Sequence, residues 1–246
     1  MKAILPRLEA WLQIHAGKWP AVYFGLYRLA RTNRTHVVSP ATQLVIEGFP
    51  RSANTFAVVA FRQAQKQDVR IAHHLHVPAQ VIRAVRWRIP TLVLIREPRD
   101  AVLSLAIRDP ISVDLALKHY ISFYGTVARH RDGYVLGLFE EVTGDYGKVI
   151  ERLNARFGTS FSRFRHNKRS VGRVLARIDR TYERKHGTAA RETEISRPSA
   201  VREQMKRELK HELTHPKRKR LIAEAEAIYE RLTVPTRRIE EGGRQP

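Results

Sequence analysis

Short apolar runs rich in β-branched residues alternate with stretches of helical periodicity through the middle of the chain. The runs that predict strands cover residues 43–49, 69–76, 91–95 and 134–140. The stretches that predict helices cover residues 55–65, 79–88, 100–108, 113–129 and 146–157. Strands that alternate with helices form a parallel sheet with both faces covered. The pattern therefore predicts an α/β fold.

The two ends of the chain differ from this middle part. Residues 5–29 carry an imperfect helical pattern broken at Pro20, which fits packing against the sheet better than contact with a membrane surface. Residues 32–40 form a polar linker, and the chain beyond Gly158 is predicted to be helical or irregular. We therefore expect an N-terminal helical segment, an α/β core and a basic helical C-terminal region packed on the same domain, at 1–40, 41–160 and 161–246.

Two of the predicted strands end in turns that can hold an anion. The first strand runs into Pro50-Arg51-Ser52-Ala53-Asn54-Thr55-Phe56. The third runs into a turn that contains Arg96, Asp100 and Ser104. A turn between strand and helix offers unpaired backbone N–H groups and the positive end of the helix dipole. Because open parallel sheets bind ligands at the carboxyl ends of their strands, the two turns predict one polyanion site.

The side chains of both turns suit phosphate or sulfate oxygens. Arg51 and Arg96 bring forked guanidinium donors with a fixed charge. Further donors are the side chains of Ser52, Asn54, Thr55 and Ser104.

These two turns resemble the nucleotide site of the sulfotransferases that use 3′-phosphoadenosine-5′-phosphosulfate (PAPS). Residues 50–56 match the family's 5′-phosphosulfate loop, Pro-(Lys/Arg)-Ser-Gly-(Thr/Asn)-Thr-aromatic. Arg96, Asp100 and Ser104 match its 3′-phosphate element, Arg-x-x-x-Asp-x-x-x-Ser. The likeness covers residues 44–158, with 139–142 at the place of the family's Tyr-Glu-Asp segment. It implies a P-loop-like sheet, PAPS as co-substrate and its bisphosphate product PAP as a ligand.

The resemblance assigns nucleotide binding to residues of both turns, namely Arg51, Ser52, Ala53, Asn54, Thr55, Phe56, Arg96 and Ser104. Ala53 stands where the family has glycine, and its Cβ predicts a backbone φ below zero. The Arg-Lys-Gly loop that completes the site in cytosolic members is not visible in this sequence. The candidates to replace it are Arg191, Arg197, Arg202 and Lys206.

Transfer of a sulfuryl group to a hydroxyl needs a base near the acceptor oxygen. In many family members this base is a histidine that closes the second strand in a Lys-Thr-His-x-Pro context. The matching region reads Ala72-His73-His74-Leu75-His76-Val77-Pro78, which lacks the lysine. The resemblance therefore implies His74 or His76 as the catalytic base, beside Arg51. Strand alternation places these two histidines on one face and His73 on the other, so His73 is predicted to be dispensable.

Other assignments for this chemistry are weaker. Glu140 or Glu141 is the reserve candidate for the base, although a carboxylate at a strand end more often forms an ion pair on so basic a surface. Zinc could use His74 and His76, but no third ligand occurs at a usual spacing. We therefore predict no metal site.

Basic residues outnumber acidic ones by 45 to 24, which leaves a net charge of +21. This charge predicts polyanionic partners: the nucleotide, an acidic acceptor, or an anionic membrane touched at its surface. Nucleic acid is the rival partner, because the last third of the chain is basic. It is disfavoured, since Trp11, Trp19 and Trp87 do not interleave with those basic residues and no known nucleic-acid motif occurs.

The sequence contains no cysteine, no apolar run that could span a bilayer and no secretory signal pattern. We expect a cytoplasmic protein with at most peripheral membrane contact. The predicted function is sulfuryl transfer from PAPS to an acceptor hydroxyl or amine. A nucleotide phosphotransferase on a related core is the alternative enzyme, although the Gly-Lys-Ser/Thr triplet and a magnesium aspartate are missing. A polyanion-binding module without catalysis is the alternative from another class.

Overall fold

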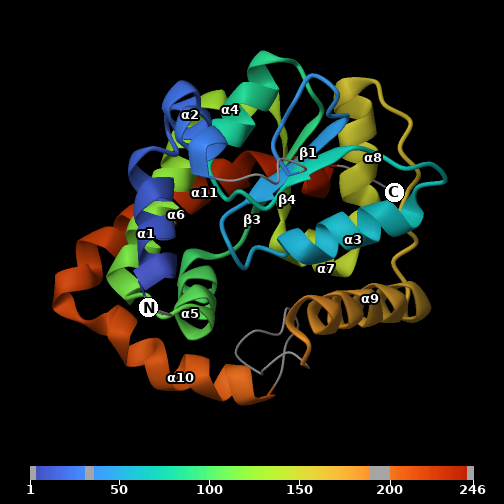
Figure 1. Ribbon diagram of the computed structural model, residues 1–246. Coiled ribbons are helices and arrows are strands. Elements are labelled where there is room, and N and C mark those ends of the chain that lie inside the picture. Colours follow the sequence, from blue (N-terminus) through green and yellow to red (C-terminus); the bar gives the residue numbers. More distant parts are fainter. Residues whose placement is uncertain (1–3, 31–35, 189–199, 243–246) are drawn as a thin grey trace.

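The chain folds around a four-stranded parallel sheet of strand order β2-β1-β3-β4 (Figure 1). The structure is a computed structural model that describes residues 4–30, 36–188 and 200–242. The strands are β1 Leu44–Gly48, β2 Ile71–His73, β3 Thr91–Ile95 and β4 Val135–Leu138. β1 has β2 on one side and β3 on the other, so the chain reverses its direction across the sheet between β1 and β3. In open α/β sheets such a switch point is where ligands bind.

Helices make up most of the remaining chain. The described α-helices are α1 Ile4–His15, α2 Pro20–Ala30, α3 Asn54–Ala64, α4 Pro78–Arg86, α5 Pro98–Arg108, α6 Val113–Val127, α7 Phe139–Gly144, α8 Tyr146–Phe157, α9 Lys168–His186, α10 Ala200–Thr214 and α11 Lys219–Gly242. Two 3₁₀ helices, η1 Ala128–Gly133 and η2 Pro216–Arg218, lie between them. Gly158 ends α8 with a left-handed φ of 63°, as expected for a glycine C-cap.

The sheet is buried on both faces because successive side chains of each strand point to opposite layers. On β1, Leu44 and Ile46 pack in one apolar cluster with residues of α3, α8 and α9. Val45 packs with residues of α2 and α4, and Val93 on β3 packs with residues of α5, α6 and α11. The α/β fold with a parallel sheet flanked by helices, and the helical C-terminal part, are therefore confirmed.

Two strands are shorter than the apolar pattern predicts. β2 ends at His73, because His74 and His76 adopt left-handed φ values of 60° and 55° that an extended strand cannot contain. β4 ends at Leu138, whose backbone N–H donates to the Glu141 carboxylate at 2.8 Å. That carboxylate caps the first turn of α7, so the end of the predicted strand at 134–140 is helical instead.

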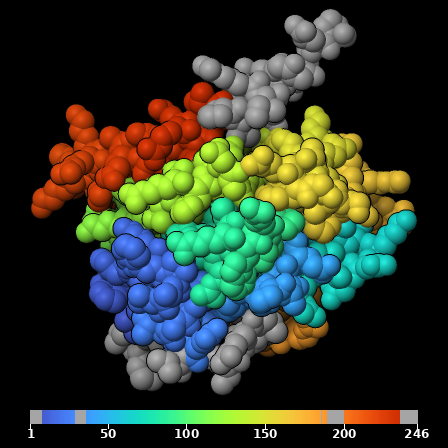
Figure 2. Space-filling view, turned by 90° about the horizontal axis from the view of Figure 1, so that it is seen from above, coloured from blue at the N-terminus to red at the C-terminus, as the bar shows by residue number. Residues whose placement is uncertain are grey.

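The N-terminal helices pack on the outside of this core. The break at Pro20 separates α1 from α2, as predicted, and α1 lies against α6 while α2 lies against α4. Figure 2 shows the N-terminal part (blue) beside the α4 region (blue-green) on one face of the molecule. Among the described residues, no helix is both long enough and apolar enough to cross a bilayer.

Candidate functional site

A cavity of about 320 Å³ opens where the carboxyl ends of β1 and β3 meet. Both turns singled out in the sequence line it, together with side chains of α9 and α10. The basic residues in its wall are Arg51, Arg96, Arg108, Arg202 and Lys206. Its apolar wall contains Phe56, Phe139, Val171 and Leu175. The arrangement suits a ligand that carries anionic groups and an apolar body.

The loop after β1 is held in a conformation that non-glycine residues rarely adopt. Arg51 has a φ of 70° and Ala53 a φ of 67°, so the expectation that the Cβ of Ala53 keeps φ below zero is wrong. Each left-handed non-glycine residue costs on the order of 1 kcal/mol or more and persists only where its surroundings enforce it. Such residues occur in ligand clamps and catalytic turns.

Interior hydrogen bonds enforce this loop conformation. The Asn54 amide donates to the Phe49 carbonyl at 2.9 Å, and the Ser52 hydroxyl lies 3.3 Å from the Tyr124 hydroxyl. Tyr124 in turn donates to the Leu94 carbonyl at 2.6 Å, which ties the loop to β3. Ser52 is fully buried and Asn54 nearly so. These two side chains therefore shape the loop, and Asn54 also lines the cavity; their contact with the ligand stays a prediction.

Besides the basic side chains in the cavity wall, the start of α3 offers hydrogen-bond donors to the cavity. In the described part of the chain no side chain caps this helix at Ala53. The first backbone N–H groups of α3, from Asn54 to Phe56, therefore present the positive end of the helix dipole. Thr55 lines the cavity beside them and adds a hydroxyl.

Ser104 joins the two predicted elements to the C-terminal region. Its hydroxyl oxygen accepts hydrogen bonds from Arg51 Nε at 3.0 Å and from Arg202 Nη2 at 2.9 Å. Arg96 donates to Asp100 at 2.8 Å and stacks 4.0 Å above the ring of Phe139. The structure thus brings Arg51, Arg96 and Ser104 together, although they lie in two separate segments of the sequence.

Positive charge is concentrated around Arg51, because Arg96, Arg108 and Arg202 lie close to it in the cavity wall. Burial, together with the nearby charges of Arg202, Arg108 and Arg96, lowers the pKa of Arg51 to about 9. A guanidinium whose pKa is depressed by other cations is stabilised when an anion binds among them. The site is therefore built to receive negative charge.

Two of the four C-terminal basic candidates lie in this cluster. Arg202 is only 3% exposed, and Lys206 lies 3.7 Å from the Asp100 carboxylate. Both are on α10 and line the cavity. Arg191 and Arg197 fall outside the described residues. Sequence reasoning could not choose among the four, because contact between α10 and α5 is set by tertiary packing.

The histidines form a directional chain of hydrogen bonds that ends at Thr55. The Arg62 guanidinium, which can only donate, lies 3.4 Å from His73 Nε2. This nitrogen also lies 3.3 Å from His36 Nδ1. With Arg62 as the donor to Nε2, His73 carries its proton on Nδ1, which lies 2.6 Å from His74 Nδ1. His74 must then carry its proton on Nε2 and donate to the Thr55 hydroxyl at 3.1 Å. His73 is thus the partner that sets the tautomer of His74, rather than a residue of an opposite layer.

His76 has the other tautomer. Its Nδ1 lies 2.7 Å from the Gly48 carbonyl oxygen, which can only accept, so Nδ1 carries the proton and Nε2 has a free lone pair. Burial, followed by the charge of His74, lowers the pKa of His76 well below its usual value. His76 lines the cavity as a neutral proton acceptor. Because β2 ends at His73, the predicted sharing of one strand face by His74 and His76 is wrong.

A carboxylate that sequence reasoning missed holds this histidine turn in place. Glu47 on β1 is fully buried and accepts from the backbone N–H groups of Leu75 and His76 at 2.8 and 3.1 Å. The Gln80 side chain donates to it at 2.9 Å. The signal in the sequence is an acidic residue inside an otherwise apolar strand, which requires buried partners.

Glu47 should make stability depend on pH in a recognisable way. Burial raises its pKa from 4.5 to about 7, against the opposing effect of its N–H donors. The folded state then holds a proton that the unfolded state releases, so rising pH between 4.5 and about 7 makes the contribution of Glu47 to the free energy of unfolding fall by on the order of 3 kcal/mol. The buried histidines His73, His76 and His119, whose pKa values are lowered by burial, contribute with the opposite sign. In Glu47→Gln only the contribution of Glu47 is expected to disappear, so the difference between the two proteins isolates it.

Urea unfolding at a series of pH values measures this difference between the two proteins. Glu140→Gln is the matched control, because Glu140 is exposed, and it should follow the unmodified protein. Parallel curves for the unmodified protein and Glu47→Gln would show that Glu47 does not titrate in this range.

The reserve carboxylates do not line the cavity. Glu141 forms an ion pair with Arg152 at 2.7 Å, and Glu140 is exposed on α7. In the described ranges, no group of three or more histidine, aspartate or glutamate side chains is placed to hold a metal ion.

Comparison with solved protein structures gives several matches. The chain is similar to mouse sulfotransferase SULT7A1, solved in complex with PAP, at 11% sequence identity and a TM-score of 0.42. The likeness covers 74% of this chain and 88% of the mouse protein. No model of a protein family and no curated protein matches the chain.

Proposed function

We propose that the protein is a sulfotransferase that moves a sulfuryl group from PAPS to an acceptor hydroxyl. The observation that carries this proposal is the position of Ser104 between Arg51 and Arg202. These residues lie beside the loop after β1, which has left-handed residues and is located at the switch point of the sheet. Two phosphate-binding elements that share one cavity fit a nucleotide with anionic groups at both its 3′ and 5′ positions.

The residues of the cavity divide between the two anionic groups of the nucleotide, the 5′-phosphosulfate and the 3′-phosphate. The backbone N–H groups at the start of α3, with Arg51 and Thr55, would hold the 5′-phosphosulfate. Arg96, Ser104 and Arg202 would hold the 3′-phosphate. The apolar wall would take the adenosine, since nucleobases bury well against apolar side chains.

The histidines then have distinct roles in the transfer. The acceptor oxygen attacks sulfur, its proton passes to His76 Nε2, and the bond from sulfur to the bridging phosphate oxygen breaks. PAP leaves with the electron pair of that bond. Arg51 stabilises the negative charge that develops on the leaving phosphate. The Thr55 hydroxyl accepts from His74, so its own proton is directed away from His74 and can meet a non-bridging oxygen.

Nucleotide choice tests the proposal directly. PAP is expected to bind at least about tenfold more tightly than AMP, because even one charge-assisted hydrogen bond to its 3′-phosphate is worth about 1.5–3 kcal/mol. Titration calorimetry with both nucleotides measures the ratio. In Arg202→Gln the ratio should shrink while AMP affinity stays nearly constant.

Arg177→Gln provides the control for this variant. It removes the same charge from an exposed position on α9 and should leave the PAP to AMP ratio unchanged. Equal affinity of the unmodified protein for PAP and AMP would contradict the assignment of a 3′-phosphate site.

A further inference from the structure

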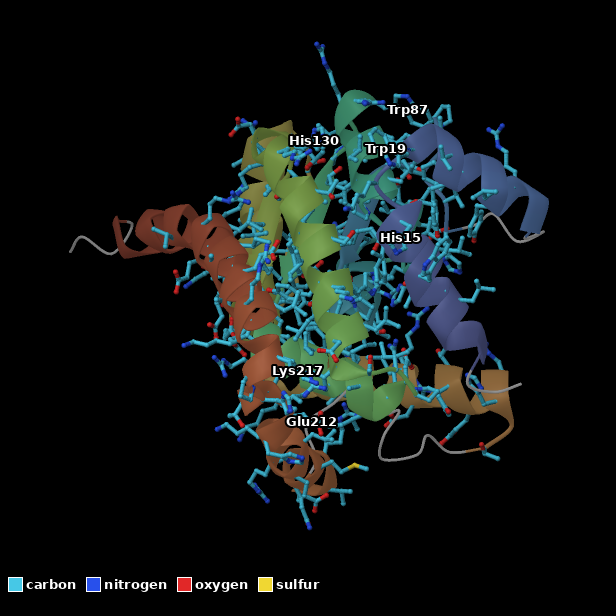
Figure 3. The ribbon with its side chains drawn as sticks, turned by 90° about the vertical axis from the view of Figure 1, so that its left-hand side faces the viewer. His15, Trp19, Trp87, His130, Glu212 and Lys217 are labelled. Atoms are coloured by element: carbon cyan, nitrogen blue, oxygen red, sulfur yellow. The ribbon has the colours of Figure 1, made fainter. Side chains whose placement is uncertain are left out.

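The tryptophans of this chain are placed unusually. The sequence contains three, and all are exposed: Trp11 by 52%, Trp19 by 64% and Trp87 by 45%. Tryptophan is on average a highly buried residue, so exposure of every one requires an explanation. Figure 3 shows Trp19 and Trp87 at the same end of the molecule, and the Arg83 guanidinium contacts both the Trp87 ring and Phe24 of α2.

Further apolar residues are exposed along the two N-terminal helices. On α1, Leu8 and Trp11 are exposed one turn apart, and on α2, Val22 and Leu26 are exposed at a spacing of four. Helical residues three or four positions apart lie on one side of their helix. Each helix therefore has an uncovered apolar stripe in addition to the side that packs on the core.

Basic residues surround a groove beside Trp19. The groove, of about 790 Å³, lies where the turn between α1 and α2 meets α4, α6 and α11. Its floor contains the buried Ile82 and Ile228. Exposed basic side chains in its wall are Lys18, Arg86, Arg129 and Arg231, and its acidic lining residue is Glu224.

We propose that this face, formed by the exposed apolar residues of α1, α2 and Trp87 and the basic groove beside them, binds the surface of an anionic phospholipid bilayer. Exposed tryptophans and aliphatic residues can enter the boundary of the acyl chains. The lysine and arginine side chains beside them can contact the anionic headgroups. The inference does not depend on the proposed chemistry.

Two other occupants fit this face less well. A second copy of the chain on a two-fold axis would bring the same basic groove residues of both copies together, and like charges repel. A nucleic acid would use the basic residues and the tryptophans, but it would leave Leu8, Val22 and Leu26 without apolar contact. A bilayer is the partner that uses the charges, the aromatic rings and the aliphatic stripes together.

The tryptophans themselves report on the inference. Because Trp19 and Trp87 lie at one end of the molecule and Trp11 is exposed on α1, intrinsic fluorescence of the full chain should shift to shorter wavelength when the rings enter a bilayer. The shift is expected with vesicles of phosphatidylcholine mixed with phosphatidylglycerol, and it should be much smaller with phosphatidylcholine alone. High salt should weaken the interaction because exposed charges are screened.

Two double variants distinguish binding through this face from general attraction of the bilayer to a positively charged protein. Arg86→Glu with Arg129→Glu should weaken vesicle co-sedimentation by about tenfold or more. Arg177→Glu with Arg180→Glu is the control, since it changes the charge equally on the exposed side of α9. Val22→Ser with Leu26→Ser should also weaken binding, although it changes no charge. Circular dichroism of each variant verifies its fold.

Three outcomes would overturn the inference. Equal weakening of vesicle binding by both double charge-reversal variants would show that net charge, and not this face, determines binding. An equal fluorescence shift with a single-stranded oligonucleotide, lost on Arg86→Glu with Arg129→Glu, would make the partner a nucleic acid. Absence of any shift with anionic vesicles, together with a dimer in light scattering that Trp19→Ala dissociates, would make this face a contact between two copies of the chain.

Discussion

Arg51→Ala is expected to lower the turnover number for sulfuryl transfer by about 10²–10³-fold, or roughly 2–4 kcal/mol in the activation barrier. Arg51 occupies the left-handed start of the loop, and its Nε is held 3.0 Å from Ser104 Oγ. Burial and then the surrounding cations lower its pKa, so it gains most when negative charge develops on the leaving phosphate. The loss should therefore fall on turnover more than on affinity for PAP.

Single-turnover transfer from PAPS, with PAP affinity measured in parallel, separates these two effects. Arg51→Lys is the informative control, because it keeps a charge at this position but lacks the forked guanidinium. It should recover part of the rate. An unchanged turnover number in Arg51→Ala would show that this partly buried arginine only supports the loop.

The parallel sheet could be predicted because each strand is marked in the sequence by an apolar run rich in β-branched residues. β3 lies at the predicted residues 91–95, since five consecutive apolar or β-branched residues can be stable only when both faces are covered. The turn residues after β1 and β3 could be assigned to one place for the same reason, because adjacent parallel strands end at the same edge. The domain boundaries and the roles of the site residues stay predictions.

Backbone conformation at the loops could not be predicted from residue type. Glycine is the usual residue for a left-handed turn, yet Arg51, Ala53, His74 and His76 all adopt one. The residues before Ala53 are held by Tyr124, which contacts Phe49 and Ser52, is distant in sequence and reaches the loop only after α6 packs on the sheet. Tertiary contacts of this kind override local preference.

The C-terminal part of the site was hidden for a related reason. Arg202 is one of many basic residues on amphipathic helices, and its neighbours in sequence carry no phosphate motif. Only the packing of α10 on α5 buries it beside Ser104. Glu47, in contrast, could have been noticed, because a carboxylate in a fully buried strand requires specific donors.

His76→Asn is expected to lower the rate of the chemical step by about 10²–10⁴-fold, the usual contribution of a general base. Asparagine can still donate to the Gly48 carbonyl, so the turn should keep its shape while the proton acceptor is lost. His74→Asn should have a smaller effect: the shorter side chain loses the hydrogen bond from His74 Nε2 to Thr55, but His74 has no free acceptor nitrogen in this tautomer.

The pH profile gives an independent test of the same assignment. A base works only when unprotonated, and burial lowers the pKa of His76 well below 6.5. The unmodified protein should therefore keep its single-turnover rate as pH falls through 6.5 and lose it only at lower pH. In His76→Asn this acid limb should be absent from the residual rate. If His74→Asn instead abolished the chemical step while His76→Asn retained it, the proton would pass to His74, and His73 and His74 would have the opposite tautomers, without a hydrogen bond from Arg62 to His73 Nε2.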